Sequence, residues 1–344
     1  MKKTVFLAYL ALLISFLPPL LGADRPGAQT APPEAAASAV LPEAPAPSAE
    51  LAPAEPASAP AAQTRLRVLV GEDCVEMDMQ DYLLGVVAAE MPADFQPEAL
   101  KAQAVAARTY ALYCAAGHKH GEADVCTDYA CCQAWLSRDA LRENWGAAYA
   151  ANLRKIRAAV SSTEGESLSY EGQPVFAAFH SSSPGATEDC GQLWNAQPYL
   201  VSVSSPESAE TVPGYVSTLV CEPLDFRDAL LSVCPEADFS GPEEGWIGPL
   251  SRDDSGRVAN VVLGGEEFPG VELRSLFSLR STAFTLEYAD GRFVFTVTGS
   301  GHGVGMSQYG AEVMAARGAD YREILAHYYP GTSLEKRGGA PSQN

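Results

Sequence analysis

Glu90 is the residue whose surroundings in the sequence point most directly to catalysis. The spacing of apolar residues predicts a helix from Asp81 onward, and Pro92 ends that helix just beyond Glu90. Four residues at i, i+3, i+4 and i+7 share one face of this helix: Leu83, Val86, Val87 and Glu90. Desolvation there would raise the pKa of the carboxyl group, as protonation of a glycosidic oxygen near neutral pH requires. The alternative is an exposed glutamate at a helix end, the commoner case on pattern alone.

Residues 117–135 (GHKHGEADVCTDYACCQAW) are rich in metal-ligating side chains. Four ligands could come from His120, Cys126, Cys131 and Cys132, with His118 as a spare. Thiolate and neutral imidazole are the usual ligands of zinc, and a set of four makes a closed structural site. Adjacent cysteines rarely bind one ion together, so Cys131 is the weaker candidate. The alternative is one disulfide and one free thiol.

Residues 175–195 (VFAAFHSSSPGATEDCGQLWN) carry His180 followed by three serines, Ser181, Ser182 and Ser183. The GxSxG elbow of serine hydrolases is missing. We therefore interpret this segment as a cleft-lining loop that hydrogen-bonds a sugar or an amide, while His180 could equally be a structural histidine. Glu188 is a second carboxylate and a candidate partner of Glu90, because ordinary glycoside hydrolysis uses two.

Residues 299–310 (GSGHGVGMSQYG) place glycine at alternate positions. The spacing does not match the nucleotide-binding patterns. Glycines at this spacing allow the backbone to approach another backbone or a ligand closely. Ser307 is predicted to cap a helix, and His302 and Gln308 are candidate ligand contacts. A tight packing turn is an equally good interpretation.

The elements that would position these residues alternate irregularly, which predicts an α+β fold with an irregular mixed sheet and helices around a groove. Expected strands span residues 65–71, 74–79, 167–170, 174–180, 257–263 and 284–298, the last with a hairpin turn at Asp290-Gly291. Expected helices span residues 81–90, 97–117, 138–159, 226–233, 307–317 and 321–329.

The chain has 344 residues and a formal net charge of −20, which argues against nucleic acid or an anionic lipid surface as a partner. Residues 1–22 predict a membrane anchor or a signal peptide, which places the rest outside the cytoplasm. Residues 23–64 are rich in Pro and Ala and predict a disordered linker, and residues 336–344 a disordered tail. The folded domain should span residues 65–335. Cys221 and Cys234 could form a disulfide, the default for extracytoplasmic cysteines.

In their order along residues 65–335, these motifs resemble the stage II sporulation protein D family and the related amidase enhancers. The resemblance rests on the following segments: YLLGVVAAEMPADFQPEALKAQAVAARTYAL, CQAW, FHSSSPGATED, LWNAQPYLVSVSSP, LRSTAF and GHGVGMSQYGAEVMAARGADYREILAHYYPGT. It implies a peptidoglycan lytic transglycosylase that cleaves the MurNAc–GlcNAc bond of glycan strands stripped of stem peptides, leaving 1,6-anhydro ends, in sporulation. Glu90, in the AAEMP motif, would be its catalytic acid and base.

The resemblance also implies a structural zinc in some members of the family. His120, Cys126 and Cys132 match its ligands, whereas Cys131 stands where the family has histidine. Pro184 replaces a usual glycine, and the tryptophan usual before Gly-His-Gly is missing. We expect the following side chains to contact the glycan: Ser181, Ser182, Ser183, Glu188, Tyr199, His302 and Gln308.

Two partners beyond the glycan are expected. One is the membrane, through residues 1–22, so the protein would be a single-pass membrane protein with an extracytoplasmic domain, or a secreted one if the segment is cleaved. The other is a cell-wall amidase of the same machinery. The alternative function is therefore a non-catalytic, glycan-binding enhancer of such an amidase.

Overall fold

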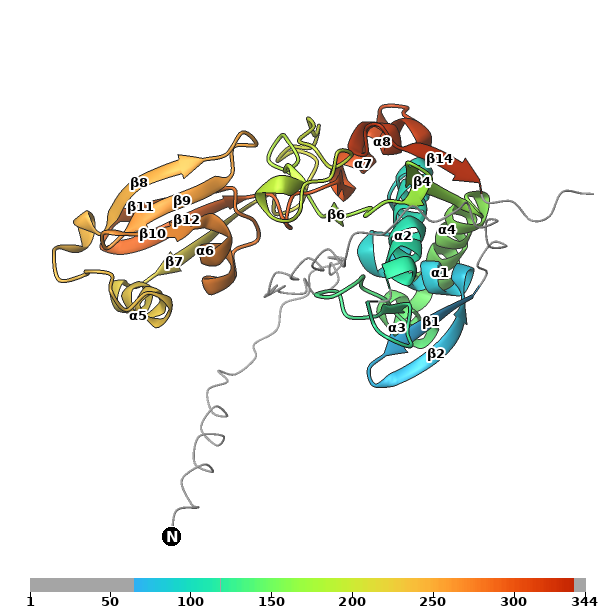
Figure 1. Cartoon of the computed structure of the whole chain (residues 1–344), viewed down its shortest axis with the longest axis horizontal. Coiled ribbons are helices and arrows are strands. Elements are labelled where there is room, and N and C mark those ends of the chain that lie inside the picture. The colour runs from blue at the N-terminus through green and yellow to red at the C-terminus, as the bar shows by residue number, and fades with distance from the viewer. Residues whose placement is uncertain (1–64, 118, 337–344) are drawn as a thin grey trace, which may run out of the picture. The chain divides into compact units, whose positions relative to one another are not determined.

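The computed structural model describes residues 65–117 and 119–336. Helices and several small sheets alternate irregularly along this part of the chain, which confirms the α+β prediction (Figure 1). Buried hydrophobic residues form two clusters. The first core draws on residues 66–200 and 304–329, and the second on residues 226–297. The chain thus begins the first core, builds the second, and returns to complete the first.

The two helices around Glu90 lie in the first core. Helix α1 (Met79–Glu90) begins where the Asp78 side chain accepts a hydrogen bond from the Gln80 N–H at 2.8 Å, and helix α2 (Pro97–Gly117) follows the predicted break. Helix α2 is central in this core: α1, α4 (Tyr149–Ser162), α7 (Gln308–Ala316) and α8 (Tyr321–Tyr328) all contact it (Figure 1). Small alanine side chains along α2 are buried and allow this close packing.

Three small sheets accompany the first core. In one, β1 (Arg65–Val70) lies between β2 (Asp73–Asp78) and β3 (Val125–Cys126); in another, β4 (Glu166–Tyr170) lies between β14 (Ser333–Lys336) and β5 (Gln173–Pro174). The third joins β6 (Phe179–His180) to β13 (Met306–Ser307) in parallel. This last pairing brings residues 175–195, the serine loop, together with residues 299–310, the glycine-rich loop. More than 100 residues of the chain separate the two loops.

The second core lies among two three-stranded antiparallel sheets. Their orders are β11-β12-β7, made of Phe284–Ala289, Arg292–Thr298 and Val216–Cys221, and β10-β9-β8, made of Glu266–Pro269, Val258–Leu263 and Ile247–Arg252. Helices α5 (Pro223–Val233) and α6 (Gly270–Leu276) accompany them. The predicted Asp290-Gly291 hairpin turn is confirmed, with φ of 51° and 77° at the two residues.

Several predicted elements differ from the structure. Residues 138–159 form two helices, α3 (Arg138–Trp145) and α4, because Gly146 adopts a φ of 46° and a 3₁₀ turn (η1, Gly146–Ala148) follows. The strand expected at 174–180 is interrupted, and β6 pairs with β13 rather than with β4. Helix α1 is buried on more than one face, since Tyr82 and Leu84 are buried as well as Leu83. Strand β14 includes Lys336, which the sequence assigned to the tail.

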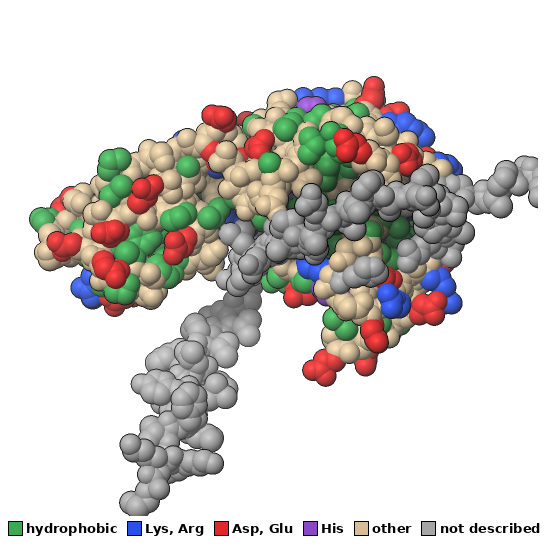
Figure 2. Space-filling model, viewed as in Figure 1, with side chains coloured by type: hydrophobic (Ala, Val, Ile, Leu, Met, Phe, Trp, Pro, Cys, Tyr) green, Lys and Arg blue, Asp and Glu red, His purple; other side chains and the backbone are tan. Residues whose placement is uncertain are grey.

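The expected membrane segment, the linker and residues 337–344 of the tail lie outside the described residues. Within the described ranges, we find no helix of the length and apolarity that crossing a bilayer would require. On the face drawn in Figure 2, Asp and Glu side chains are scattered widely over the described surface, in keeping with the net charge of −20.

Candidate active site and metal centre

Glu90 is the last residue of α1, and its carboxylate is half-buried between two hydrogen-bond donors. Its Oε1 accepts from the Ala134 main-chain N–H at 2.9 Å, and its Oε2 accepts from the Gln308 side-chain amide at 3.4 Å. Burial raises the pKa of Glu90 to about 7, and the two hydrogen bonds act in the opposite direction. A carboxyl group with this pKa exchanges a proton near neutral pH, as the sequence predicted, and can serve as both acid and base.

The segment that carries Ala134 is fixed against α1 and α2. The Gln133 side chain donates to the Ala107 carbonyl at 3.2 Å, and the Leu136 N–H donates to the Gly85 carbonyl at 3.3 Å. The Trp135 indole packs directly on Gly85, where an added Cβ would come within 2.2 Å of the indole nitrogen. Residues 133–136 therefore hold the Ala134 N–H in place for Glu90.

The predicted metal ligands do come together just before this segment. The ligand atoms of His120, Cys126, Cys131 and Cys132 all lie within 4.8 Å of one another. The His120 Nε2 lies 3.1 Å from the Cys132 sulfur and 3.8 Å from the Cys131 sulfur. Ligands around a tetrahedral zinc are separated by roughly 3.5–3.8 Å, given Zn–S and Zn–N bonds of about 2.3 and 2.0 Å. The donor set therefore fits zinc, with Cys131 in the fourth place, and the separation of His120 from Cys131 matches this geometry.

The remaining cysteines bear on this cluster in different ways. All eight lie in the described part of the chain and are free thiols there, so neither the Cys221–Cys234 pairing nor a disulfide in the cluster is present. Cys114, buried on α2, is a neighbour of Cys132 that the sequence did not reveal, because it lies on the preceding helix. His118, the spare ligand, lies outside the described residues.

The serine loop is folded inward more than the sequence suggested. Ser182 and Ser183 are almost completely buried, while Ser181 is half-buried. The Ser183 hydroxyl lies 2.6 Å from His180 Nε2, and the Ser182 and Ser300 backbones hydrogen-bond each other in both directions. These contacts stabilise the loop itself, so of the three serines only Ser181 has a side chain within direct reach of a ligand.

The alternate glycines of residues 299–310 allow the close backbone approach that was predicted. Gly299, Gly301, Gly303 and Gly305 all have positive φ. At Gly305 an added Cβ would lie 2.0 Å from the Ala178 carbonyl oxygen, and at Gly301 it would lie 2.7 Å from the His180 Cβ. Ser307 caps α7 as predicted, since its side chain accepts from the Gly310 N–H at 3.1 Å.

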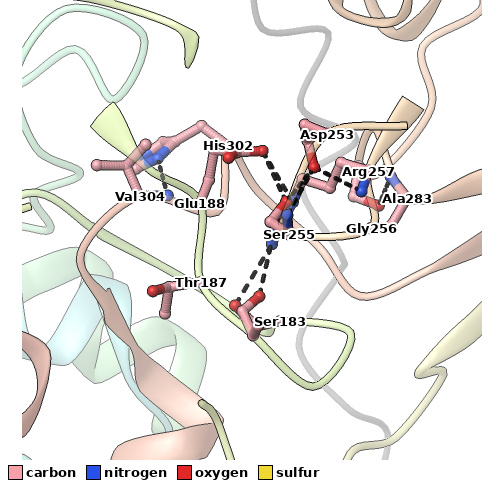
Figure 3. A network of polar contacts seen from close by, with 12 residues as sticks. Ser183, Thr187, Glu188, Asp253, Ser255, Gly256, Arg257, Ala283, His302 and Val304 are labelled. Carbon is pink, nitrogen blue, oxygen red and sulfur yellow. Dashed lines mark hydrogen bonds and ion pairs between the residues drawn. The ribbon is translucent and has the colours of Figure 1, made fainter. Parts of the chain in front are cut away.

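Glu188, the candidate partner of Glu90, belongs to a different network (Figure 3). Its carboxylate is buried, accepts from the Ser255 hydroxyl at 3.0 Å, and lies 4.0 Å from the Arg257 Nε. Burial raises its pKa to about 7 although Arg257 lowers it. Arg257, which directly precedes β9, also donates to the Ala186 carbonyl at 3.1 Å, so this network fastens the serine loop to the start of that strand.

Two further candidate ligand contacts are also engaged within the protein. The Tyr199 hydroxyl accepts from the Phe176 N–H at 3.2 Å, and the ring is buried. His302 Nδ1 accepts from the Val304 N–H at 3.1 Å (Figure 3), and its ring lies 5.0 Å from that of Trp194. Burial lowers the pKa of His302 to about 3, so its imidazole is neutral at physiological pH. Gln308 alone among the predicted contacts hydrogen-bonds Glu90.

Comparison with known proteins identifies the family to which this chain belongs. A family model described as stage II sporulation protein matches residues 72–170, which include Glu90 and the four metal-ligand candidates. The chain is 37% identical over 263 residues to the stage II sporulation protein D of Bacillus amyloliquefaciens, covering 75% of this chain and 74% of that protein. The chain belongs to the stage II sporulation protein D family. The resemblance seen in the sequence is thereby confirmed.

Two proteins of Bacillus subtilis (strain 168) extend the comparison. Its stage II sporulation protein D is 36% identical over 293 residues, covering 84% of this chain and 82% of that protein. Its amidase enhancer is 28% identical over 311 residues, covering 73% of this chain but only 40% of the enhancer. Similarity to a stage II sporulation protein D thus covers more than four fifths of this chain.

Proposed function

We propose that this chain is a peptidoglycan lytic transglycosylase that acts in sporulation on glycan strands free of stem peptides. The observation that carries the proposal is the state of Glu90: one half-buried carboxyl group with a pKa of about 7, held by an N–H and an amide. Ordinary glycoside hydrolysis needs a second carboxylate, and Glu188 is instead engaged by Ser255 and Arg257. A single acid and base suits an internal ring closure.

Glu90 alone can carry out both proton transfers of that ring closure. The Glu90 proton moves to the glycosidic oxygen while the bond from that oxygen to C1 of the muramyl residue breaks. The carboxylate then accepts the proton of the muramyl C6 hydroxyl as its oxygen bonds to C1. Glu90 ends the cycle protonated, no water is consumed, and the product carries a 1,6-anhydro end.

The Cys/His cluster supports this role from outside the reaction. His120, Cys126, Cys131 and Cys132 would hold zinc, which in a closed four-ligand site supplies a structural cross-link. Its contribution would be to fix residues 131–134 and thus the donor to Oε1 of Glu90. We place the folded domain outside the cytoplasm, attached to the membrane or secreted according to the fate of residues 1–22.

A second function is favoured by the similarity to an amidase enhancer. In that case the same domain binds glycan and stimulates a cell-wall amidase without cleaving the strand. The two functions are separated by incubating the full chain with denuded glycan, alone and with an amidase. Turnover by the wild type that is lost in Glu90→Gln supports the transglycosylase. Binding without turnover, together with a faster amidase, supports the enhancer.

A further inference from the structure

Glu207 is a buried carboxylate that none of the sequence motifs includes. Its side chain is 4% exposed and has three hydrogen-bond donors. Oε1 accepts from the Ser183 N–H at 2.6 Å and from the Ser307 hydroxyl at 2.5 Å, and Oε2 accepts from the Ser205 hydroxyl at 2.6 Å. A buried carboxylate is costly unless such donors surround it, so this position is a specifically built one.

The Ser307 hydroxyl links Glu207 to the first turn of α7. A hydroxyl has one proton to donate. Because that proton goes to Glu207, the oxygen lone pairs are directed to the Gly310 N–H, which completes the helix cap at 3.1 Å. An anion at the start of a helix is also favoured by the helix dipole. Gln308, the first residue of α7, is the residue whose amide reaches Oε2 of Glu90.

The packing around Glu207 leaves α7 little freedom. A Cβ added at Gly310 would lie 2.8 Å from Glu207 Oε2, 2.5 Å from the Ser205 hydroxyl and 2.0 Å from the Tyr328 hydroxyl. The last two groups hydrogen-bond each other at 2.8 Å. The backbone of α7 therefore packs directly against Glu207, Ser205 and Tyr328, which fixes the position of the Gln308 backbone from which its side chain extends.

We propose that Glu207 is a positioning residue that, through Ser307 and the first turn of α7, holds the Gln308 amide against Glu90. It also fixes the serine loop by accepting the hydrogen bond of the Ser183 N–H. One carboxylate therefore positions both the serine loop and the start of α7. The inference rests on the proposed function for the importance of Glu90, but its geometry does not depend on turnover. Glu188, the second carboxylate considered in the sequence analysis, is bonded to neither Ser307 nor Gln308 among the described contacts.

The test measures the ionisation of Glu90 in the folded full chain, with no substrate present. The carboxyl carbon of Glu90 is followed by NMR in protein labelled with ¹³C-glutamate and is assigned by its loss in Glu90→Gln. The Gln308 hydrogen bond lowers the pKa of Glu90. Glu207→Ala should therefore raise that pKa by roughly half a unit, and Gln308→Ala should do the same. In the double variant the two effects should not add.

Two more variants separate positioning from general stability. Glu207→Gln keeps an oxygen that can accept from Ser183 and Ser307, so it should restore the wild-type pKa. Glu166→Ala removes a matched buried carboxylate, bonded to the Tyr321 hydroxyl at 2.8 Å, and should lower the melting temperature while leaving the Glu90 pKa unchanged. If Glu207→Ala does not fold, Glu207→Asp, which is too short to reach Ser183 and Ser307 together, takes its place with the same expected direction.

An unchanged Glu90 pKa in folded Glu207→Ala, or in Glu207→Asp where that variant replaces it, overturns the inference. So does a shift caused by the Glu207 substitution that persists in full when Gln308 is already alanine. Neither result concerns catalysis. A wild-type protein that leaves glycan uncut would instead overturn the proposed function and leave the Glu207 result standing.

Discussion

The Ala134 N–H donates to the Glu90 carboxylate at 2.9 Å, and Ala134 follows Cys132, a metal-ligand candidate, by two residues. The cluster and the proposed catalytic carboxyl group are therefore connected by a very short piece of chain. The Cys/His segment therefore fixes the Ala134 N–H, whose hydrogen bond partly offsets the rise in the pKa of Glu90 that burial causes.

Replacing Gly85 by alanine should disturb that piece of chain. The new Cβ would lie 2.2 Å from the Trp135 indole nitrogen and 2.8 Å from the Leu136 carbonyl oxygen, so residues 134–136 must move. We expect a loss of about 1–3 kcal/mol in the free energy of unfolding, typical of overpacking, measured by denaturant titration. Gly241→Ala, where nothing lies within 4 Å, is the control. Equal stability of the two variants would contradict the packing described.

Loss of the proposed zinc site should weaken the support of the Glu90 carboxylate. Cys132→Ser is expected to abolish stoichiometric zinc binding, lower the melting temperature and reduce glycan cleavage, because the segment that carries Ala134 loses its cross-link. The checks are elemental analysis and thermal unfolding of the purified chain. Cys74→Ser changes an exposed thiol outside the cluster and should retain zinc. Full zinc content in Cys132→Ser would exclude the proposed ligand set.

The raised pKa of Glu90 predicts how stability depends on pH. The folded-state pKa is about 7, against 4.5 for the unfolded chain, so the folded state binds this proton more tightly. Stability from this group is complete below pH 4.5 and is lost as pH rises through 7. Glu90→Gln cannot ionise, so it does not lose this stability at high pH. Above pH 7 its melting temperature should exceed that of the wild type, and its free energy of unfolding should be larger by at most about 3 kcal/mol, or less because the side chain is partly exposed to solvent. Below pH 4.5 the two proteins should be equally stable.

Thermal unfolding of both proteins across this pH range is the measurement. A constant difference between them at all pH values would mean that Glu90 titrates normally. Catalysis should follow the same group: the rate of glycan cleavage falls above pH 7 as the acid form disappears.

Arg257 should be essential to the network that holds the serine loop. Arg257→Met keeps most of the side-chain volume but leaves the buried Glu188 carboxylate without its cation, which we expect to cost about 3–5 kcal/mol. Adding Glu188→Gln should recover part of that loss, because the remaining side chain is neutral. Denaturant titration of the single and double variants provides the comparison. No recovery in the double variant would show that the ion pair is not the source of the loss.

How far the sequence could predict the site differs from residue to residue. The setting of Glu90 follows from local signals, an apolar helix and Pro92, and the Ser307 cap is equally local, so both were predictable. Glu207 was not, because its partner Ser307 lies 100 residues away and the chain between them forms the separate second core. Glu188 was a candidate partner of Glu90 because ordinary glycoside hydrolysis uses two carboxylates, and only the fold could reveal that Arg257 is its neighbour.

The fold shows the same division. Periodicity and turn residues located most helices and the Asp290-Gly291 hairpin, whereas β6 is a two-residue strand that exists only because β13 returns from the far end of the chain. Strands β7 and β8 lie in a stretch, 204–256, whose Pro, Asp, Glu and Ser content hides their alternation.

The central claim, that Glu90 alone performs a ring closure without water, is tested most directly by the masses of the glycan fragments. Denuded glycan is incubated with the full chain and, as a control, with its Glu90→Gln variant. The account predicts fragments with 1,6-anhydro ends, each lighter by one water than a hydrolytic product, and none from the variant. Reducing ends from the wild type, or undiminished cleavage by Glu90→Gln, would contradict it.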